Sequence, residues 1–231
     1  MKQKSYDKNQ EETPRIISAS ESHMALVFVL DVSHSMRGTA IKQLNEGLNR
    51  FKEEVCRDKQ TKEILDVAII EFSDEYNVVQ PFVPIEFMNP VNLEAGGSTK
   101  FTGPIREAIK MVDERSRFYR RSGSEPYKPW ILLVTDGGPL DDITEVTKEV
   151  WDMQDDGKVR FIALGVGGYH SGSLKKLTDV VFRMEGTDFT SFFDWVGKSM
   201  RSVSTTAPGE KPALPTIGGN ITRDISDIFW S

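Results

Sequence analysis

The feature that most constrains the fold is a near-continuous apolar run, residues 25–30, that ends directly in Asp31. Such a run is typical of a strand that is buried on both faces, as in a parallel sheet. Segments of the same character follow at residues 65–72, 130–135, 159–166 and, more weakly, 180–184. Residues 78–83 differ because they contain Pro81, which lacks an N–H donor. We therefore expect 78–83 to be an edge strand in a hairpin with 65–72.

Helical periodicity fills the intervals between these strands. Apolar residues spaced by three and four positions give each predicted helix one apolar face. The four faces are Ile41, Leu44, Leu48, Phe51 and Val55; Ile105, Ala108, Ile109 and Val112; Ile143, Val146, Val150 and Met153; and Phe189, Phe192, Phe193, Val196, Met200 and Val203. This alternation predicts an α/β fold with a doubly wound, mostly parallel sheet, one antiparallel edge strand and helices on both faces.

The pattern divides the chain into three parts. Residues 1–22 are polar and predict a flexible N-terminal tail, 23–204 form the α/β domain, and 205–231 form a linker followed by an amphipathic segment. In that segment the spacing of apolar residues predicts a short helix capped by Asn220, with Ile221, Ile225, Ile228 and Phe229 on one face. Because so short a helix is marginal alone, we expect it either to pack on its own domain or to dock on a partner.

Charge and hydropathy exclude several classes of protein. A net charge of -6 argues against nucleic-acid binding, and the basic run 115–121 is typical of a solvated helix end. The N-terminal residues form no apolar signal region, and no apolar run approaches the ~20 residues that span a bilayer. We therefore expect a cytoplasmic protein that does not enter a membrane.

Polar residues gather at the carboxyl ends of the predicted strands, where parallel sheets bind ligands. Asp31, Ser33 and Ser35 follow the first strand, Thr99 follows a Gly-Gly turn before a helix, and Asp136 follows the strand 130–135. Two carboxylates and three hydroxyls are hard oxygen ligands, which favour magnesium, manganese or calcium over zinc or copper. Magnesium retains water readily, so such a site leaves a coordination position for an incoming carboxylate.

The pattern Asp31-x-Ser33-x-Ser35 with a distant Thr99 and a strand-end Asp136 resembles the complete metal-ion-dependent adhesion site (MIDAS) of von Willebrand factor A (vWA) domains. The resemblance covers about residues 24–203 and implies the Rossmann-like fold of that family. It implies that the five residues hold Mg²⁺ or Mn²⁺, with Ca²⁺ as a further option, and that the ion binds an Asp or Glu of a protein partner.

Two details of the pattern stay open. The position between the serines, often glycine in this family, is His34, and Thr102 or Ser98 could replace Thr99 as the ligand.

Residues 41–49 resemble the intracellular, bacterial tellurite-resistance Y-type vWA proteins. That resemblance implies a role in stress response, with a Ser/Thr kinase or a phosphatase of the same pathway as a partner.

The residues assigned to the metal site also have other interpretations. Single Ser, Thr and Asp residues at strand ends are often only helix caps. An apolar strand ending in aspartate also begins the magnesium-dependent haloacid-dehalogenase-like phosphatases, but their second aspartate is Ser33 here, so the general acid is missing. We therefore expect a binding module and no enzyme; a scaffold that no longer binds metal is the third alternative.

Overall fold

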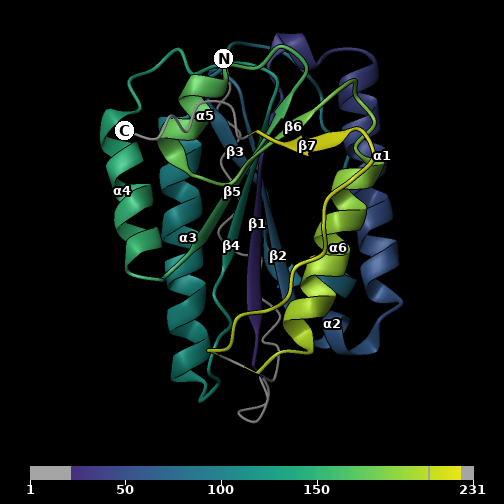
Figure 1. The fold of residues 1–231 in the computed structure, drawn as a ribbon, viewed down its shortest axis with the longest axis vertical. Coiled ribbons are helices and arrows are strands. Elements are labelled where there is room, and N and C mark those ends of the chain that lie inside the picture. The colour runs from purple at the N-terminus through teal and green to yellow at the C-terminus, as the bar shows by residue number, and fades with distance from the viewer. Residues whose placement is uncertain (1–21, 208, 225–231) are drawn as a thin grey trace.

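The computed structural model describes residues 22–207 and 209–224 and is built on a seven-stranded sheet (Figure 1). The strand order is β3-β2-β1-β4-β5-β6-β7. The strands are β1 (Met24–Asp31), β2 (Leu65–Phe72), β3 (Tyr76–Pro84), β4 (Trp130–Thr135), β5 (Arg160–Val166), β6 (Val181–Met184) and β7 (Ile221–Arg223). The pairs from β2 through β1, β4 and β5 to β6 are parallel, whereas β3 and β7 are antiparallel to their neighbours. The mostly parallel sheet and the β2–β3 hairpin are thus confirmed, but the sheet has a second antiparallel edge strand, β7, where one was expected.

Helices cover both faces of the sheet, as expected (Figure 1). One face carries α1 (Thr39–Cys56), α2 (Lys59–Ile64) and α6 (Thr190–Ser204), and the other carries α3 (Thr102–Arg121), α4 (Thr144–Asp155) and α5 (Ser171–Leu177). The short helices α2 and α5 were not predicted, because one or two turns are too few to show an apolar period. Among the described residues, no helix is both long and apolar enough to cross a membrane.

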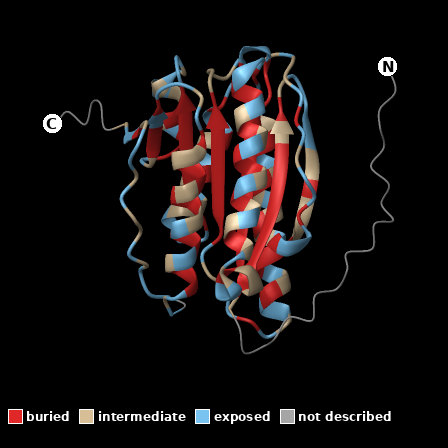
Figure 2. Cartoon of the chain, turned by 90° about the vertical axis from the view of Figure 1, so that its right-hand side faces the viewer, coloured by how far each residue is buried: buried red, intermediate tan, exposed pale blue. Residues whose placement is uncertain are grey.

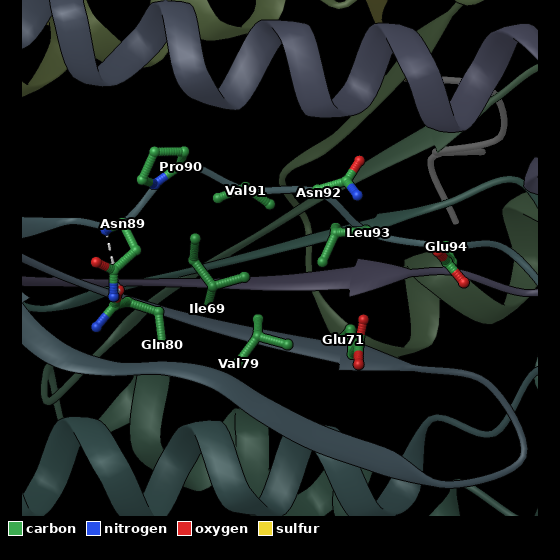
Figure 3. Close-up of a pocket in the computed structure, with 10 residues that line it drawn as sticks. All are labelled: Ile69, Glu71, Val79, Gln80, Asn89, Pro90, Val91, Asn92, Leu93 and Glu94. Atoms are coloured by element: carbon green, nitrogen blue, oxygen red, sulfur yellow. Dashed lines mark hydrogen bonds between the residues drawn. The ribbon is translucent and has the colours of Figure 1, made fainter. Parts of the chain in front are cut away.

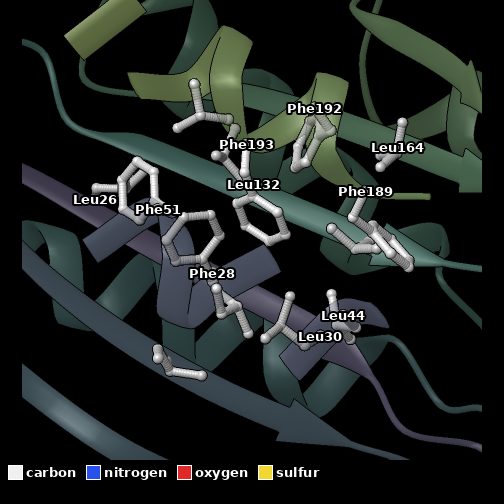
Figure 4. Packing of buried hydrophobic residues seen from close by; sticks show 14 of the residues in the cluster. Leu26, Phe28, Leu30, Leu44, Phe51, Leu132, Leu164, Phe189, Phe192 and Phe193 are labelled. Carbon is white, nitrogen blue, oxygen red and sulfur yellow. The ribbon is translucent and has the colours of Figure 1, made fainter. Parts of the chain in front are cut away.

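A hydrophobic core lies on each side of the sheet, and the central strands are buried along their length (Figure 2). The core under α1 and α6 is rich in phenylalanine (Figure 4). The Phe28 ring of β1 packs against Phe51 of α1 and Phe193 of α6, with ring centroids 5.4 and 5.7 Å apart. Edge-to-face and tilted contacts of this kind add to the free energy of simple burial, so Phe28 anchors the middle of β1 to both helices.

The basic run at the end of α3 is solvated, as expected, at Arg117, Arg120 and Arg121, but not at its first residue. Arg115 is buried, and its Nη2 donates to Oδ2 of Asp66 in β2 at 2.7 Å. The Tyr119 hydroxyl, one turn further along α3, donates to the same oxygen. Because burial would strongly destabilise an unpaired charge, these bonds explain how Asp66 and Arg115 are accommodated inside the protein.

After α6 the chain returns along that helix to the sheet (Figure 1). Trp195 Nε1 donates to Pro215 O at 2.8 Å, and Ser202 Oγ donates to Ala213 O at 2.6 Å. This returning segment, residues 205–224 apart from residue 208, ends in β7, which pairs with β6.

The predicted helix beginning at Ile221 is wrong at its start. Ile221 is a buried strand residue, and Asn220 Nδ2 donates to Glu185 O and Asp188 O instead of capping a helix. Pairing with the open edge of β6 satisfies the backbone and overrides the local apolar spacing. The other predicted helix residues, Ile225, Ile228 and Phe229, and the N-terminal tail 1–21 lie outside the described residues.

Candidate metal centre

The candidate centre lies where β1 and β4 end side by side. The chain leaves β1 toward β2 on one side and later enters β4 on the other, so the strand order reverses here, which is where parallel sheets typically bind ligands. Leu30 is in register with Val134, which places Asp31 level with Thr135. The topology thus brings Asp31 and Asp136 together although they lie 105 positions apart in the sequence.

The loop after β1 folds its polar groups around one another. The Ser33 amide donates to Asp31 Oδ1 at 2.7 Å, and the Ser33 and Ser35 hydroxyl oxygens are 3.0 Å apart. Ser35 Oγ then donates to Asp136 Oδ1 at 2.7 Å. Four of the five predicted ligands therefore form one connected cluster.

A residue that the sequence analysis missed, Thr135, orients the buried Asp31. Its hydroxyl donates to Asp31 Oδ2, while its oxygen accepts the Gly137 amide at 3.1 Å. Burial raises the pKa of the Asp31 carboxyl, against the lowering effect of the bonds from Thr135 and Ser33, and the charge of Asp136 adds to the rise. Asp31 is thus a desolvated carboxylate that a cation would stabilise.

The segment 89–94, which leads to the predicted threonine ligand, is attached to α1 by two asparagines one helical turn apart. Asn45 exchanges two hydrogen bonds with the Leu93 backbone at 2.8 and 3.0 Å, and Asn49 does the same with Val91 at 2.8 and 2.9 Å. On its other side the segment borders a groove of about 450 Å³ over β2 and β3 (Figure 3). The two asparagine side chains thus bond the backbone of this segment as a neighbouring strand would, and they hold the segment that leads to Thr99 in place.

The turn that follows is bonded directly to the first loop. The Gly96 amide donates to Val32 O at 2.7 Å, and the His34 amide donates to Gly97 O at 3.0 Å. Gly97 has a φ of 82°, and a Cβ there would lie 2.6 Å from Asp74 Oδ2. Only glycine fits this conformation and this space without strain.

Of the three candidate ligands in this turn, the structure places Thr99 beside the Asp136 loop. Thr99 is buried, its carbonyl accepts the Leu140 amide at 2.9 Å, and a Cβ on Gly137 would lie 3.4 Å from Thr99 Oγ1.

The two alternative residues are engaged elsewhere. Thr102 Oγ1 donates to Asp142 O at 3.0 Å at the start of α3, and the Ser98 hydroxyl donates to Asp74. Of these three residues, Thr99 is therefore the one whose hydroxyl lies against the loop of Asp136.

The oxygen spacing fits a small, hard cation. Around magnesium, with ligands at 2.0–2.1 Å, neighbouring oxygens are about 3 Å apart. The Ser33 and Ser35 hydroxyl oxygens lie 3.0 Å apart, and Ser35 Oγ lies 2.7 Å from Asp136 Oδ1. These are hydrogen-bond lengths, and they keep the oxygens close enough to bind one such ion. Within the described part of the chain, no cluster of three or more His, Cys, Asp or Glu side chains suits a metal. Any cation here would therefore depend on hydroxyl ligands beside the two carboxylates.

Comparison with known proteins agrees with this architecture. The family model for the von Willebrand factor type A domain matches residues 25–194. The chain is 23% identical over 163 residues to inter-alpha-trypsin inhibitor heavy chain H1 from Bos taurus, covering 66% of this chain and 17% of that protein.

Solved structures share the fold. The pilus adhesin SpaC from Lactobacillus rhamnosus GG matches with a TM-score of 0.65 and 15% identity over 80% of this chain and 30% of its own. The ArnB paralog VWA2 from Sulfolobus acidocaldarius matches with a TM-score of 0.52 and 19% identity over 77% of this chain and 45% of its own. Proximal thread matrix protein 1 from the mussel byssus, with a zinc-occupied MIDAS motif, matches with a TM-score of 0.51 and 20% identity over 80% of this chain and 45% of its own. The chain spans less than half the length of each of these proteins.

Proposed function

The chain belongs to the von Willebrand factor type A domain family, and on this premise we propose that it is a divalent-cation-dependent protein-binding module. The observation that carries the proposal is the hydrogen-bonded cluster of Asp31, Ser33, Ser35 and Asp136. The Thr99 hydroxyl lies against the loop that carries Asp136. Mg²⁺ or Mn²⁺ fits these ligands, with Ca²⁺ as a further option, and the zinc of the mussel protein makes Zn²⁺ a useful comparison.

The carboxylates and the hydroxyls of the centre contribute differently to cation binding. Asp31 and Asp136 supply the negative charge, and the three hydroxyls complete an oxygen surface without adding charge. A bound cation would supply a Lewis-acidic coordination position for a carboxylate of the partner. Without a cation, Asp31 and Asp136 repel that carboxylate, so binding of an Asp or Glu depends on the metal.

The alternative, a magnesium-dependent haloacid-dehalogenase-like phosphatase, requires a proton donor two residues after Asp31. Ser33 occupies that position, and its amide is bonded back to Asp31. This observation favours the binding module. A generic phosphomonoester distinguishes the two functions, because the phosphatase predicts Mg²⁺-dependent hydrolysis that is lost in Asp31→Ala.

The proposed partner protein can be sought with the full chain as bait in an extract of its native cells. We expect a protein that is retained in Mg²⁺ and released by a chelator, and that is absent when Asp136→Ala is the bait. We further propose a bacterial stress-response pathway with a Ser/Thr kinase or a phosphatase as the partner, which rests on the resemblance of residues 41–49. Recovery of the same proteins with and without the chelator would contradict the metal-dependent mechanism.

A further inference from the structure

Two exposed apolar side chains lie at the same sheet edge as the candidate metal centre. Among the described residues, three large hydrophobic side chains are exposed: Tyr76, Phe87 and Leu140, at 42%, 63% and 75%. Tyr76 pairs with Phe72, which pairs with Asp31 on its other side. Leu140 follows Asp136 in the loop after β4, whereas Phe87 lies beyond the opposite end of β3. Exposed apolar surface is thus concentrated beside the centre.

Leu140 is exposed but its backbone is fixed. Its amide donates to Thr99 O at 2.9 Å. The carboxylate of the next residue, Asp141, accepts the amides of Phe101 and Thr102 at 2.9 and 2.8 Å, which ties the loop to the start of α3. A side chain held in this way can be covered by a partner without the entropic cost of ordering a loop. Covering an exposed leucine with an apolar group of the partner removes apolar surface from water and so adds to the free energy of binding.

We propose that the partner presents a bulky apolar residue close in sequence to its acidic residue, and that Leu140 receives this apolar side chain. The proposal rests on the proposed function and specifies the partner of the same site. Leu140 is bonded to the backbone of Thr99, so the two contacts lie close together on this surface.

The test uses the full chain and a random peptide display library. Peptides are captured in Mg²⁺ and eluted with a chelator, in parallel for the wild type, Leu140→Ser and Phe87→Ser. We expect the wild-type pool to be enriched in Asp or Glu with Leu, Ile, Phe or Trp at a constant offset. The Leu140→Ser pool should keep the acid and lose the apolar preference, and the Phe87→Ser pool should resemble the wild type.

A synthetic peptide from the wild-type pool then measures how much the Leu140→Ser change weakens peptide binding. Burial of a leucine side chain predicts roughly tenfold to hundredfold weaker binding to Leu140→Ser. Calorimetry with Mg²⁺ alone should give the same affinity for both proteins, which shows that the centre is intact in the variant. An acidic pool without an apolar preference, or a preference unchanged in Leu140→Ser, would overturn the Leu140 inference alone. A pool that is empty or lacks acidic residues would overturn the proposed function as well.

Discussion

The Thr135 hydroxyl donates a hydrogen bond to Asp31 Oδ2 between the ends of two adjacent parallel strands. Both residues are buried, and the same threonine oxygen accepts the amide of Gly137 in the loop that carries Asp136. One side chain therefore sets the orientation of one proposed carboxylate ligand and positions the loop of the other.

Replacing Thr135 with valine keeps the shape and removes both bonds. We predict that Mg²⁺ affinity falls about tenfold to hundredfold, as is usual when a group that orients a metal ligand is lost. Isothermal titration calorimetry measures this, with Thr135→Ser as the control that retains the hydroxyl. Equal affinities for Thr135→Val and the wild type would show that Asp31 needs no such support.

Replacing Asp31 with asparagine should raise the melting temperature of the metal-free domain at neutral pH. Burial raises the pKa of Asp31, so the folded state binds its proton more tightly than the unfolded state does. The stability linked to this group is present below the unfolded pKa and is lost as pH rises through the folded pKa. The advantage of Asp31→Asn should therefore shrink as pH falls toward the ordinary pKa of an aspartate side chain in an unfolded chain, about 3.9. Thermal melts in a chelator across this range measure it; an advantage that grows on acidification contradicts the account.

Valine substitutions of Thr99 and Thr102 distinguish the proposed metal ligand from the threonine that only begins α3. Thr99→Val should weaken Mn²⁺ binding measurably, because it removes the hydroxyl that lies against the Asp136 loop. Thr102→Val should leave Mn²⁺ affinity unchanged and destabilise the domain by about 1 kcal/mol, because it loses the bond to Asp142 O. Calorimetry and urea unfolding of both variants give the two numbers. The reverse pattern would make Thr102 the ligand.

The end of the returning segment is predicted to stabilise the domain. Asp224 accepts the hydroxyls of Tyr169 and Ser171 and pairs with Lys175 at 3.1 Å, which joins β7 to the start of α5. Deleting residues 208–231 removes these contacts, and we expect a loss of about 2 kcal/mol or more from hydrogen bonds to a charged group. Asp224→Ala should reproduce part of the loss, and the exposed Glu210→Ala serves as the control. An unchanged melt after the deletion would contradict this stabilising role, and docking would then require that the deletion also abolish binding of a partner.

The parallel strands and four long helices were predictable because their residues are apolar at a period that one sequence window reveals. The short helices α2 and α5 and the strand β7 were not, because their stability comes from contacts with distant segments. Asn45 and Asn49 look like solvated residues off the apolar face of α1, yet they hold the segment that leads to Thr99. Thr135 was hidden within a predicted strand, where only the pairing of β1 with β4 reveals its partner.

The most direct test of the metal centre is the thermal stability of the full chain during titration with Mg²⁺. Binding to the folded state alone stabilises it by about 2.7 kcal/mol at a hundred times the dissociation constant, which corresponds to a rise of roughly 5–10 °C for a domain of this size. We predict this rise for the wild type, also with Mn²⁺, and none for Asp136→Ala. Melts of the wild type that stay unchanged at millimolar Mg²⁺ and Mn²⁺ would contradict the claim that Asp31, Ser33, Ser35, Thr99 and Asp136 bind a divalent cation.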